Sequence, residues 1–131
     1  MIVVDNHSTD NTDAVLSSHA CHGLVVLKVN NGGSIAYSRN KGINAARGDW
    51  IAFLDSDDWW LPDKLKDCMY YCNDDVDLIY HDLKIVNNNK KIFKRKKIKT
   101  RRLKKPVLKD LLLNGNAISN SSVVVRRKLL I

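Results

Sequence analysis

Short apolar runs alternate with helix-like patterns along the first eighty residues. Apolar and β-branched runs that end at turn residues predict strands, and these runs are Ile2–Val4, Leu24–Val29, Trp50–Leu54 and Asp77–His81. Apolar spacings of three and four with suitable cap residues predict helices between them, over Thr12–Ser18, Ser34–Ala46 and Leu61–Asn73. This alternation predicts an α/β fold with a mostly parallel sheet flanked by helices.

The rest of the chain has a less regular pattern. Lys84–Val86 and Lys91–Phe93 flank an asparagine-rich turn and predict a hairpin. Pro106–Asn114 predicts a short helix that Gly115 ends, and Ser121–Arg126 predicts a last strand. The length of 131 residues suits one domain with a single hydrophobic core. We therefore predict one domain over residues 1–131.

Composition removes several classes of protein. No apolar run approaches the ~20 residues that span a bilayer, and the first residues lack the features of a signal peptide. We therefore expect a cytoplasmic location. Cys21, Cys68 and Cys72 make an odd count, which predicts reduced thiols rather than a disulfide framework. A metal site built from them is the less favoured alternative, because no paired Cys-x-x-Cys spacing supports it.

The net charge of +8 is concentrated in one basic run over residues 90–105. No acidic residue lies between Asp82 and Asp110, so any binding partner of this run should be anionic. A solvated loop and peripheral attachment to an anionic membrane leaflet are both open interpretations. The run lacks zinc-finger or RNP-type spacing, so we expect no sequence-specific nucleic-acid binding.

Four acidic and polar residues, Asp55–Asp58, follow the third predicted strand. In parallel α/β sheets, ligands bind at the carboxyl ends of strands, where Asp5 also lies. Carboxylates so close together repel one another, and a hard divalent cation commonly offsets that repulsion. A solvated acidic turn before the next helix is the alternative, and the cluster alone does not decide between them.

Several segments in order resemble the motifs of family 2 glycosyltransferases. Residues 3–12 resemble the family segment VVDDGSTDNT, residues 31–43 its glycine turn and ARNxGI helix, and residues 46–58 its AxGEYIAFLDSDD segment. Residues 76–80, 112–116 and 121–127 resemble later family segments. The resemblance covers nearly the whole chain except the basic run. It implies the GT-A, Rossmann-like fold and sugar transfer from a nucleotide donor, often UDP-linked, to a hydroxyl acceptor.

The resemblance also implies a role for each matching residue. Asp5 looks like the carboxylate that bonds the nucleotide base, and Arg39 looks like the arginine near the nucleotide. Asp55 and Asp57 resemble the D-x-D pair, which implies Asp55 near the ribose and Asp57 on Mn²⁺ or Mg²⁺ at the diphosphate. Asp55 and Asp58 are further candidates for the metal shell. Such a cation stabilises charge on a leaving diphosphate without proton transfer.

Three positions depart from the family pattern. Asn6 stands where the family has a second aspartate, His7 where it has glycine, and Ser38 where alanine is more common. If the backbone at His7 needs a positive φ, histidine is tolerated there less easily than glycine.

The resemblance implies further segments that this sequence does not contain. The family domain begins ~35–40 residues earlier, a length that fits one βα unit, and its acceptor-side acid follows the segment matched by Ser121–Arg127. The chain has no glutamate, and neither Asp82 nor Asp110 matches the general base that inverting transfer needs. We therefore expect a partial domain with no assigned catalytic base and little transferase activity alone. A missing first strand would also expose a sheet edge, at which a second copy or a separately encoded piece could pair.

Trp59 and Trp60 directly follow the acidic cluster. Aromatic faces can stack on a sugar or a nucleotide ring, whereas packing under the sheet is the alternative for at least one of them.

The favoured function is metal-dependent, inverting transfer from a UDP-sugar to a glycan or lipid-linked acceptor in polysaccharide biosynthesis at the cell envelope. An enzyme with that acceptor would lie at the inner face of the membrane. The alternative is a catalytically inactive nucleotide-binding or assembly module of the same fold. A nucleic-acid-binding domain would explain only the charge.

Overall fold

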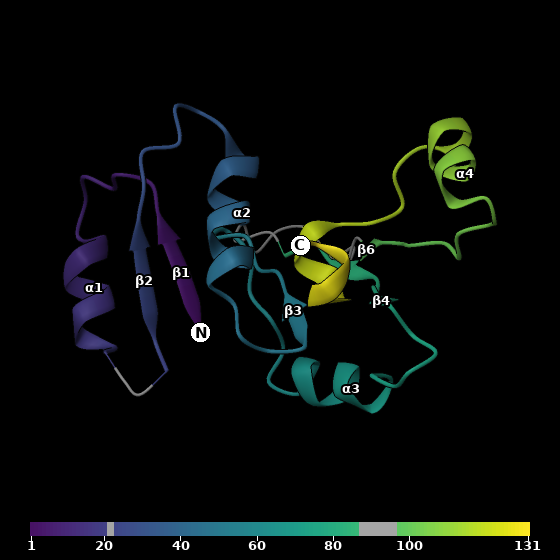
Figure 1. Cartoon of the computed structure of the whole chain (residues 1–131), viewed down its shortest axis with the longest axis horizontal. Coiled ribbons are helices and arrows are strands. Elements are labelled where there is room, and N and C mark those ends of the chain that lie inside the picture. Colours follow the sequence, from purple (N-terminus) through teal and green to yellow (C-terminus); the bar gives the residue numbers. More distant parts are fainter. Residues whose placement is uncertain (21–22, 87–96) are drawn as a thin grey trace. The chain divides into compact units, whose positions relative to one another are not determined.

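The computed structural model describes residues 1–20, 23–86 and 97–131, and Figure 1 shows its helices and strands. Contacts within the chain define two compact units, the first formed by residues 1–49 and 127–131 and the second by residues 50–126. Cys21 and the predicted strand Lys91–Phe93 lie outside the described residues.

The first unit contains a pair of parallel strands, β1 (Ile2–Asp5) and β2 (Val25–Lys28). Their register places Ile2 opposite Val25 and Asp5 opposite Lys28. The two helices of this unit are α1 (Thr12–Ser18) and α2 (Ile35–Ala45). These four elements confirm the predicted order and the parallel direction of the first two strands.

The start of α2 is capped by Ser34, whose side-chain oxygen accepts a hydrogen bond from the Tyr37 amide at 3.2 Å. The helix lies close to β1, since a Cβ added at Gly42 would come within 3.3 Å of the Val4 side chain. Glycine at this position therefore allows α2 to approach the strand that carries Asp5.

The second unit is built around β7 (Val124–Arg126), which lies between β3 (Trp50–Ala52) and β4 (Leu78–Ile79). β7 is antiparallel to both neighbours. Val123, Val124 and Val125 are all buried, so the core of this unit lies along β7. β3 and β4 run in the same direction, as expected, but they pair through an antiparallel strand rather than with each other.

The strand predicted at Ser121–Arg126 is shorter than expected. Residues Asn120–Ser122 form a 3-10 turn, and only the residues from Val124 onward are a strand. The Ser122 hydroxyl donates to the Ser119 carbonyl at 2.6 Å, and such local hydrogen bonds compete with strand pairing.

The helix predicted at Leu61–Asn73 is also shorter and is α3 (Lys64–Tyr70). Pro62 precedes it in a turn, which the Lys64 amide closes by donating to the Leu61 carbonyl at 3.0 Å. Pro62 therefore lies in this turn and outside the helix, which starts three residues later than predicted. Cys68 on α3 is buried, and both Cys68 and Cys72 are free thiols, as predicted.

A small hairpin and α4 (Val107–Asn114) complete the second unit. The hairpin pairs β5 (Leu83–Lys84) with β6 (Lys97–Ile98). The predicted helix over residues 106–114 is confirmed, and Gly115 follows it with a φ of 76°. Among the described residues, no helix has the length and apolar character needed to cross a bilayer.

Residues 97–105, the described part of the basic run, are more structured than the solvated-loop interpretation expected. They begin with β6, and Asp82 then accepts hydrogen bonds from the amide of Thr100 at 2.8 Å and from its hydroxyl at 2.9 Å. Residues 90–96 of the run lie outside the described residues.

Candidate functional site

Asp5 is a buried carboxylate at the carboxyl end of β1, with only 5% of its surface exposed. One of its oxygens accepts hydrogen bonds from the Ser8 hydroxyl and, at 3.1 Å, from the Ser8 amide. These two bonds, with the Ser8 hydroxyl as the main cause, hold the pKa of Asp5 below its usual value, and the Lys28 ammonium adds to the effect. Asp5 is therefore a fixed, charged acceptor, as base recognition would require.

His7, in the loop between β1 and α1, has a φ of 54°. This is the left-handed region that glycine occupies without cost. The position where the family pattern has glycine therefore does need a positive φ, and histidine meets that need with some strain.

We expect His7→Val to lower the free energy of unfolding by about 1–2 kcal/mol, because a β-branched residue is strained at positive φ. His7→Gly should show no such loss. Urea unfolding followed by circular dichroism measures the difference. Equal stabilities of the two variants would contradict a strained backbone at this position.

Asn6 and Ser38, the other two departures, both support the turn that leads into α2. The Asn6 side chain accepts a hydrogen bond from the Asn31 amide at 2.8 Å, and the Asn31 side chain donates to the Ser38 hydroxyl at 2.9 Å. Gly33 follows with a φ of 87°, and its amide donates to the Asn31 side chain at 2.8 Å. These bonds fix the start of the helix that carries Arg39, whose side chain is half-buried.

Asp55 lies three residues after β3 in the second unit and is held there by the 3-10 turn before β7. Its amide donates to the Ser121 hydroxyl at 3.0 Å, and one of its carboxylate oxygens accepts from the Asn120 side chain at 2.8 Å. Ser121 is 2% exposed, so this anchor is buried. Two residues 65 and 66 positions away therefore orient the first carboxylate of the acidic cluster.

The Ser121 carbonyl also accepts hydrogen bonds from the side chains of Trp60 and Lys64. The Trp60 indole donates to this carbonyl at 2.9 Å, and the Lys64 ammonium donates to it at 3.3 Å. The ammonium lies 4.2 Å from the centre of the Trp60 ring, a cation–π contact. Burial lowers the pKa of Lys64. Trp60 thus has a packing contact on its ring, whereas Trp59 is 63% exposed.

Asp57 and Asp58 follow Asp55 and are both exposed. A turn orders the segment, since the Asp58 amide donates to the Asp55 carbonyl at 3.0 Å. In the described part of the chain, no three His, Cys, Asp or Glu side chains are grouped as a metal site. The donor chemistry still fits Mg²⁺ or Mn²⁺, because these ions are commonly held by one or two carboxylates with substrate phosphates completing the shell.

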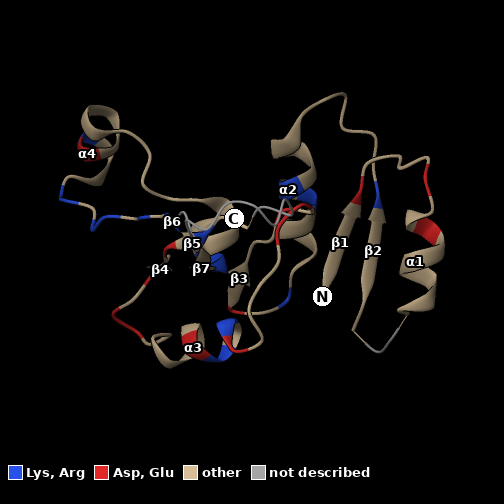
Figure 2. Cartoon of the chain, turned by 180° about the vertical axis from the view of Figure 1, so that it is seen from behind, with Lys and Arg blue, Asp and Glu red and all other residues tan. Residues whose placement is uncertain are grey.

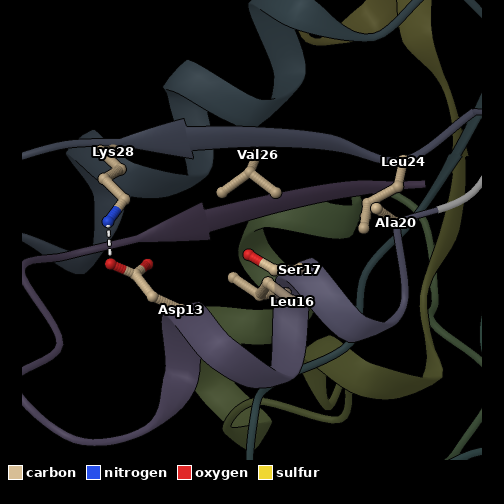
Figure 3. A pocket seen from close by; sticks show the side chains of 7 residues that line it. All are labelled: Asp13, Leu16, Ser17, Ala20, Leu24, Val26 and Lys28. Carbon is tan, nitrogen blue, oxygen red and sulfur yellow. Dashed lines mark hydrogen bonds and ion pairs between the residues drawn. The ribbon is translucent and has the colours of Figure 1, made fainter.

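A hollow of about 440 Å³ lies elsewhere, between α1 and β2 in the first unit. Figure 3 shows its lining, in which Leu16, Leu24 and Val26 supply apolar surface. Lys28 and Asp13 form an ion pair at one end. Its lining includes none of the predicted site residues.

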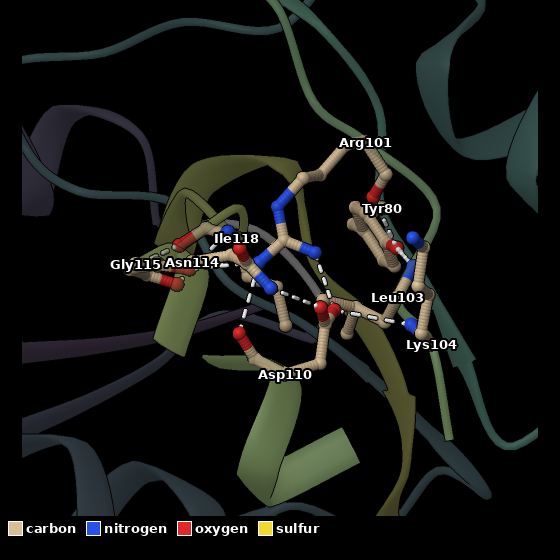
Figure 4. Close-up of polar contacts among 9 residues, drawn as sticks. Tyr80, Arg101, Leu103, Lys104, Asp110, Asn114, Gly115 and Ile118 are labelled. Carbon is tan, nitrogen blue, oxygen red and sulfur yellow. Dashed lines mark hydrogen bonds and ion pairs between the residues drawn. The ribbon is translucent and has the colours of Figure 1, made fainter. Parts of the chain in front are cut away.

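A second buried carboxylate, Asp110 on α4, is 6% exposed. Figure 4 shows its contacts: it pairs with the Arg101 guanidinium, and it accepts hydrogen bonds from the Lys104 amide at 3.0 Å and from the Asn114 side chain at 2.8 Å. Arg101 also donates to the Gly115 carbonyl at 3.0 Å. Arg101, within the basic run, therefore stabilises the fold locally.

The contacts of Asp110, with the Arg101 hydrogen bond as the main cause, lower its pKa from 3.8 to about 2. Because the pKa of Asp110 is lower in the folded state than in the unfolded state, its charged carboxylate stabilises the fold above the unfolded-state pKa. This stabilisation is lost as the pH falls from about 4 to about 2. We expect Asp110→Asn to be less stable than the wild type at pH 5, with the gap closing by pH 2. Urea midpoints at pH 5, 3.5 and 2 measure it. A gap that stays constant with pH would contradict this role.

Comparison with known proteins gives a consistent result. The family model described as Glycosyl transferase family 2 matches residues 1–131. An uncharacterized glycosyltransferase of Methanocaldococcus jannaschii is 30% identical over 99% of the chain, and another of Nostoc sp. is 32% identical over 89% of it. The UDP-Glc:alpha-D-GlcNAc-diphosphoundecaprenol beta-1,3-glucosyltransferase WfgD of Escherichia coli is 31% identical over 68% of the chain.

The chain spans less than half of the length of each of these relatives. The matched part is 46% of the Methanocaldococcus protein, 37% of the Nostoc protein and 36% of the Escherichia coli protein.

Proposed function

Because the chain belongs to glycosyl transferase family 2, we propose that it carries the nucleotide-sugar-binding part of a glycosyltransferase. The donor is a UDP-linked sugar and the acceptor is a glycan or a lipid-linked glycan of the cell envelope. The Escherichia coli relative named above is, by its name, a UDP-Glc-dependent enzyme with a diphosphoundecaprenol acceptor. That name supports the choice of nucleotide and acceptor class.

The observation that carries the proposal is the anchoring of Asp55. Asn120 bonds this carboxylate and Ser121 bonds the Asp55 amide, three residues after β3, while Asp57 and Asp58 are exposed beside it. A held carboxylate suits a ribose hydroxyl, and exposed ones suit a hydrated divalent cation. We propose Asp55 for the ribose and as a metal candidate, Asp57 as the principal metal ligand, and Asp58 as a further one.

In the first unit, we propose that Asp5 accepts a hydrogen bond from the nucleotide base and that Arg39 binds the base or a phosphate. The Ser8 hydrogen bonds keep the Asp5 carboxylate charged although it is buried, and they hold it in place. Arginine suits this role because its planar guanidinium recognises both rings and phosphates. Trp59, with its exposed ring, is the better placed of the two tryptophans to stack on a sugar.

In the reaction, an acceptor hydroxyl oxygen bonds to the anomeric carbon as the bond from that carbon to the diphosphate breaks, with inversion. A general base, unassigned in this chain, takes the hydroxyl proton. A divalent cation, when bound, would supply charge stabilisation at the leaving diphosphate. The residues proposed above bind and orient the donor.

Two partners remain proposals of the same kind. The basic run over residues 90–105 would contact an anionic membrane surface peripherally, which would bring the enzyme to a lipid-linked acceptor. An exposed sheet edge would pair with a second copy of the chain.

Calorimetric titration of UDP, with and without Mn²⁺, tests the proposed donor site. We expect saturable UDP binding that requires the cation and exceeds the binding of GDP. Absence of binding with either nucleotide would contradict a donor site in this chain. UDP binding that Mn²⁺ does not change would contradict the role of the acidic cluster.

A further inference from the structure

Helix α4 presents large apolar side chains to solvent. Leu108 and Leu112, four residues apart on one side of the helix, are 71% and 77% exposed, and Leu113 is 71% exposed. Asp110 is the buried residue of the helix instead, and it accepts a hydrogen bond from the Asn114 side chain and pairs with Arg101. Exposed apolar patches of this kind usually mark an interaction surface.

The charges around these leucines all have one sign. Asp110 is the only acid from residue 97 to the end of the chain, and it is buried and neutralised by Arg101. The remaining charged residues from 97 to 109 are exposed cations, and these are Lys97, Lys99, Arg102, Lys104, Lys105 and Lys109. Figure 2 shows basic residues along the segment that enters α4. The partner of this surface must therefore combine negative charge with an apolar interior.

The segment before α4 is held in a defined position. The Tyr80 hydroxyl donates to the Arg101 carbonyl at 2.8 Å and accepts from the Leu103 amide at 3.2 Å. With the Arg101–Asp110 pair, these bonds fix the cations beside the helix, so binding would cost less conformational entropy than it would for a free loop.

We propose that residues 97–114, the α4 surface, form a membrane-docking element that inserts its leucines among the headgroups of anionic phospholipids. Lys109 lies on α4 and the other cations lie in the segment just before it, and exposed leucines combined with basic residues are also found in helices that lie in the bilayer interface. A nucleic acid would pair its phosphates with the lysines and arginines but would leave the leucines exposed to water. The inference rests on the peripheral contact proposed for the basic run and adds an apolar anchor to it.

Flotation of the full chain with vesicles tests the proposal. We expect binding to phosphatidylcholine vesicles that contain 30% phosphatidylglycerol and little binding to phosphatidylcholine alone. Leu108→Ser/Leu112→Ser should weaken binding to the anionic vesicles about 10-fold or more. The matched control is Leu61→Ser/Leu65→Ser on and before α3, which removes two leucines that are 62% and 48% exposed and should bind as the wild type does.

The charge contribution has its own pair of variants. Lys104→Gln/Lys105→Gln should weaken binding about 30-fold at low salt, at the usual contribution of a basic residue near an anionic surface. The control Lys66→Gln/Lys128→Gln removes the same charge from two other exposed positions and should change binding much less. Raising the salt concentration should weaken the wild type.

The outcomes separate the apolar anchor from the electrostatic contact. If the charge variant weakens binding but the leucine variant does not, the anchor is overturned and the peripheral contact stands. If vesicles fail to bind the wild type, both are overturned. A dimer in sedimentation that Leu108→Ser/Leu112→Ser abolishes, without vesicle binding, would assign the surface to a second copy instead. Hydrogen exchange tests the proposal on the wild type without any substitution. Anionic vesicles should slow the exchange of the amides of residues 107–114.

Discussion

Asp57→Ala is expected to weaken Mn²⁺-dependent UDP binding roughly 100-fold or more, because even changes to the second shell of a metal site cost about 10–100-fold. Asp57 is exposed and follows the anchored Asp55, so its removal should not disturb the fold. The affinity is measured by calorimetry with Mn²⁺ present and again with the cation removed by chelation. Without the cation, the wild type and the variant should bind UDP equally weakly.

Two matched variants define what this loss means. Asp75→Ala removes another exposed aspartate of the second unit and should leave UDP affinity unchanged. Asp58→Ala should have a smaller effect than Asp57→Ala if Asp57 is the principal ligand. Equal affinities for the Asp57 and Asp75 variants would show that the loss of one negative charge, rather than of a ligand, explains any change.

Val124→Asp should unfold the second unit. Val124 is 3% exposed and pairs with Ala52 on one side and Ile79 on the other. An unpaired carboxylate there would cost several kcal/mol, which is comparable with the total stability of about 5–15 kcal/mol typical of a domain. All three tryptophans of the chain, Trp50, Trp59 and Trp60, lie in this unit. Their fluorescence emission should therefore shift to longer wavelength.

The control for this variant is Val86→Asp. Val86 is 57% exposed, so an aspartate there stays hydrated and should leave the emission near that of the wild type. A native-like emission spectrum for Val124→Asp would mean that β7 is not the centre of the core.

The α/β, GT-A fold class predicted from the sequence is confirmed, but among the described strands only β1 and β2 pair in parallel, whereas a mostly parallel sheet was expected. Membership of glycosyl transferase family 2 implies the GT-A fold, and strands and helices alternate as expected up to β4. The antiparallel place of β7 was not predicted, because a pattern of apolar residues does not encode which strand a later strand joins. The predicted ends of α3 and β7 were also wrong, because local turns with their own hydrogen bonds replace the helix and the strand there.

The positions of the site residues could be predicted from the strand pattern, because Asp5 ends β1 and Asp55 comes shortly after β3. The residues that contact them could not be predicted in this way. Asn120 and Ser121 reach Asp55, and the Ser121 carbonyl reaches Trp60, through contacts between distant parts of the sequence, and no local signal marks such contacts. The positive φ of His7 did have a signal, namely a histidine at a position where the resembling motif has glycine.

The central place of β7 has a consequence for biosynthesis. Ala52 pairs with Val124, about seventy residues later in the chain. At a translation rate of about 5–20 residues per second, the ribosome completes β7 several seconds after β3. During that interval β3 and β4 lack the strand that joins them, and their open edges can pair with other nascent chains. The yield of soluble protein should therefore depend on how fast this stretch is translated relative to aggregation.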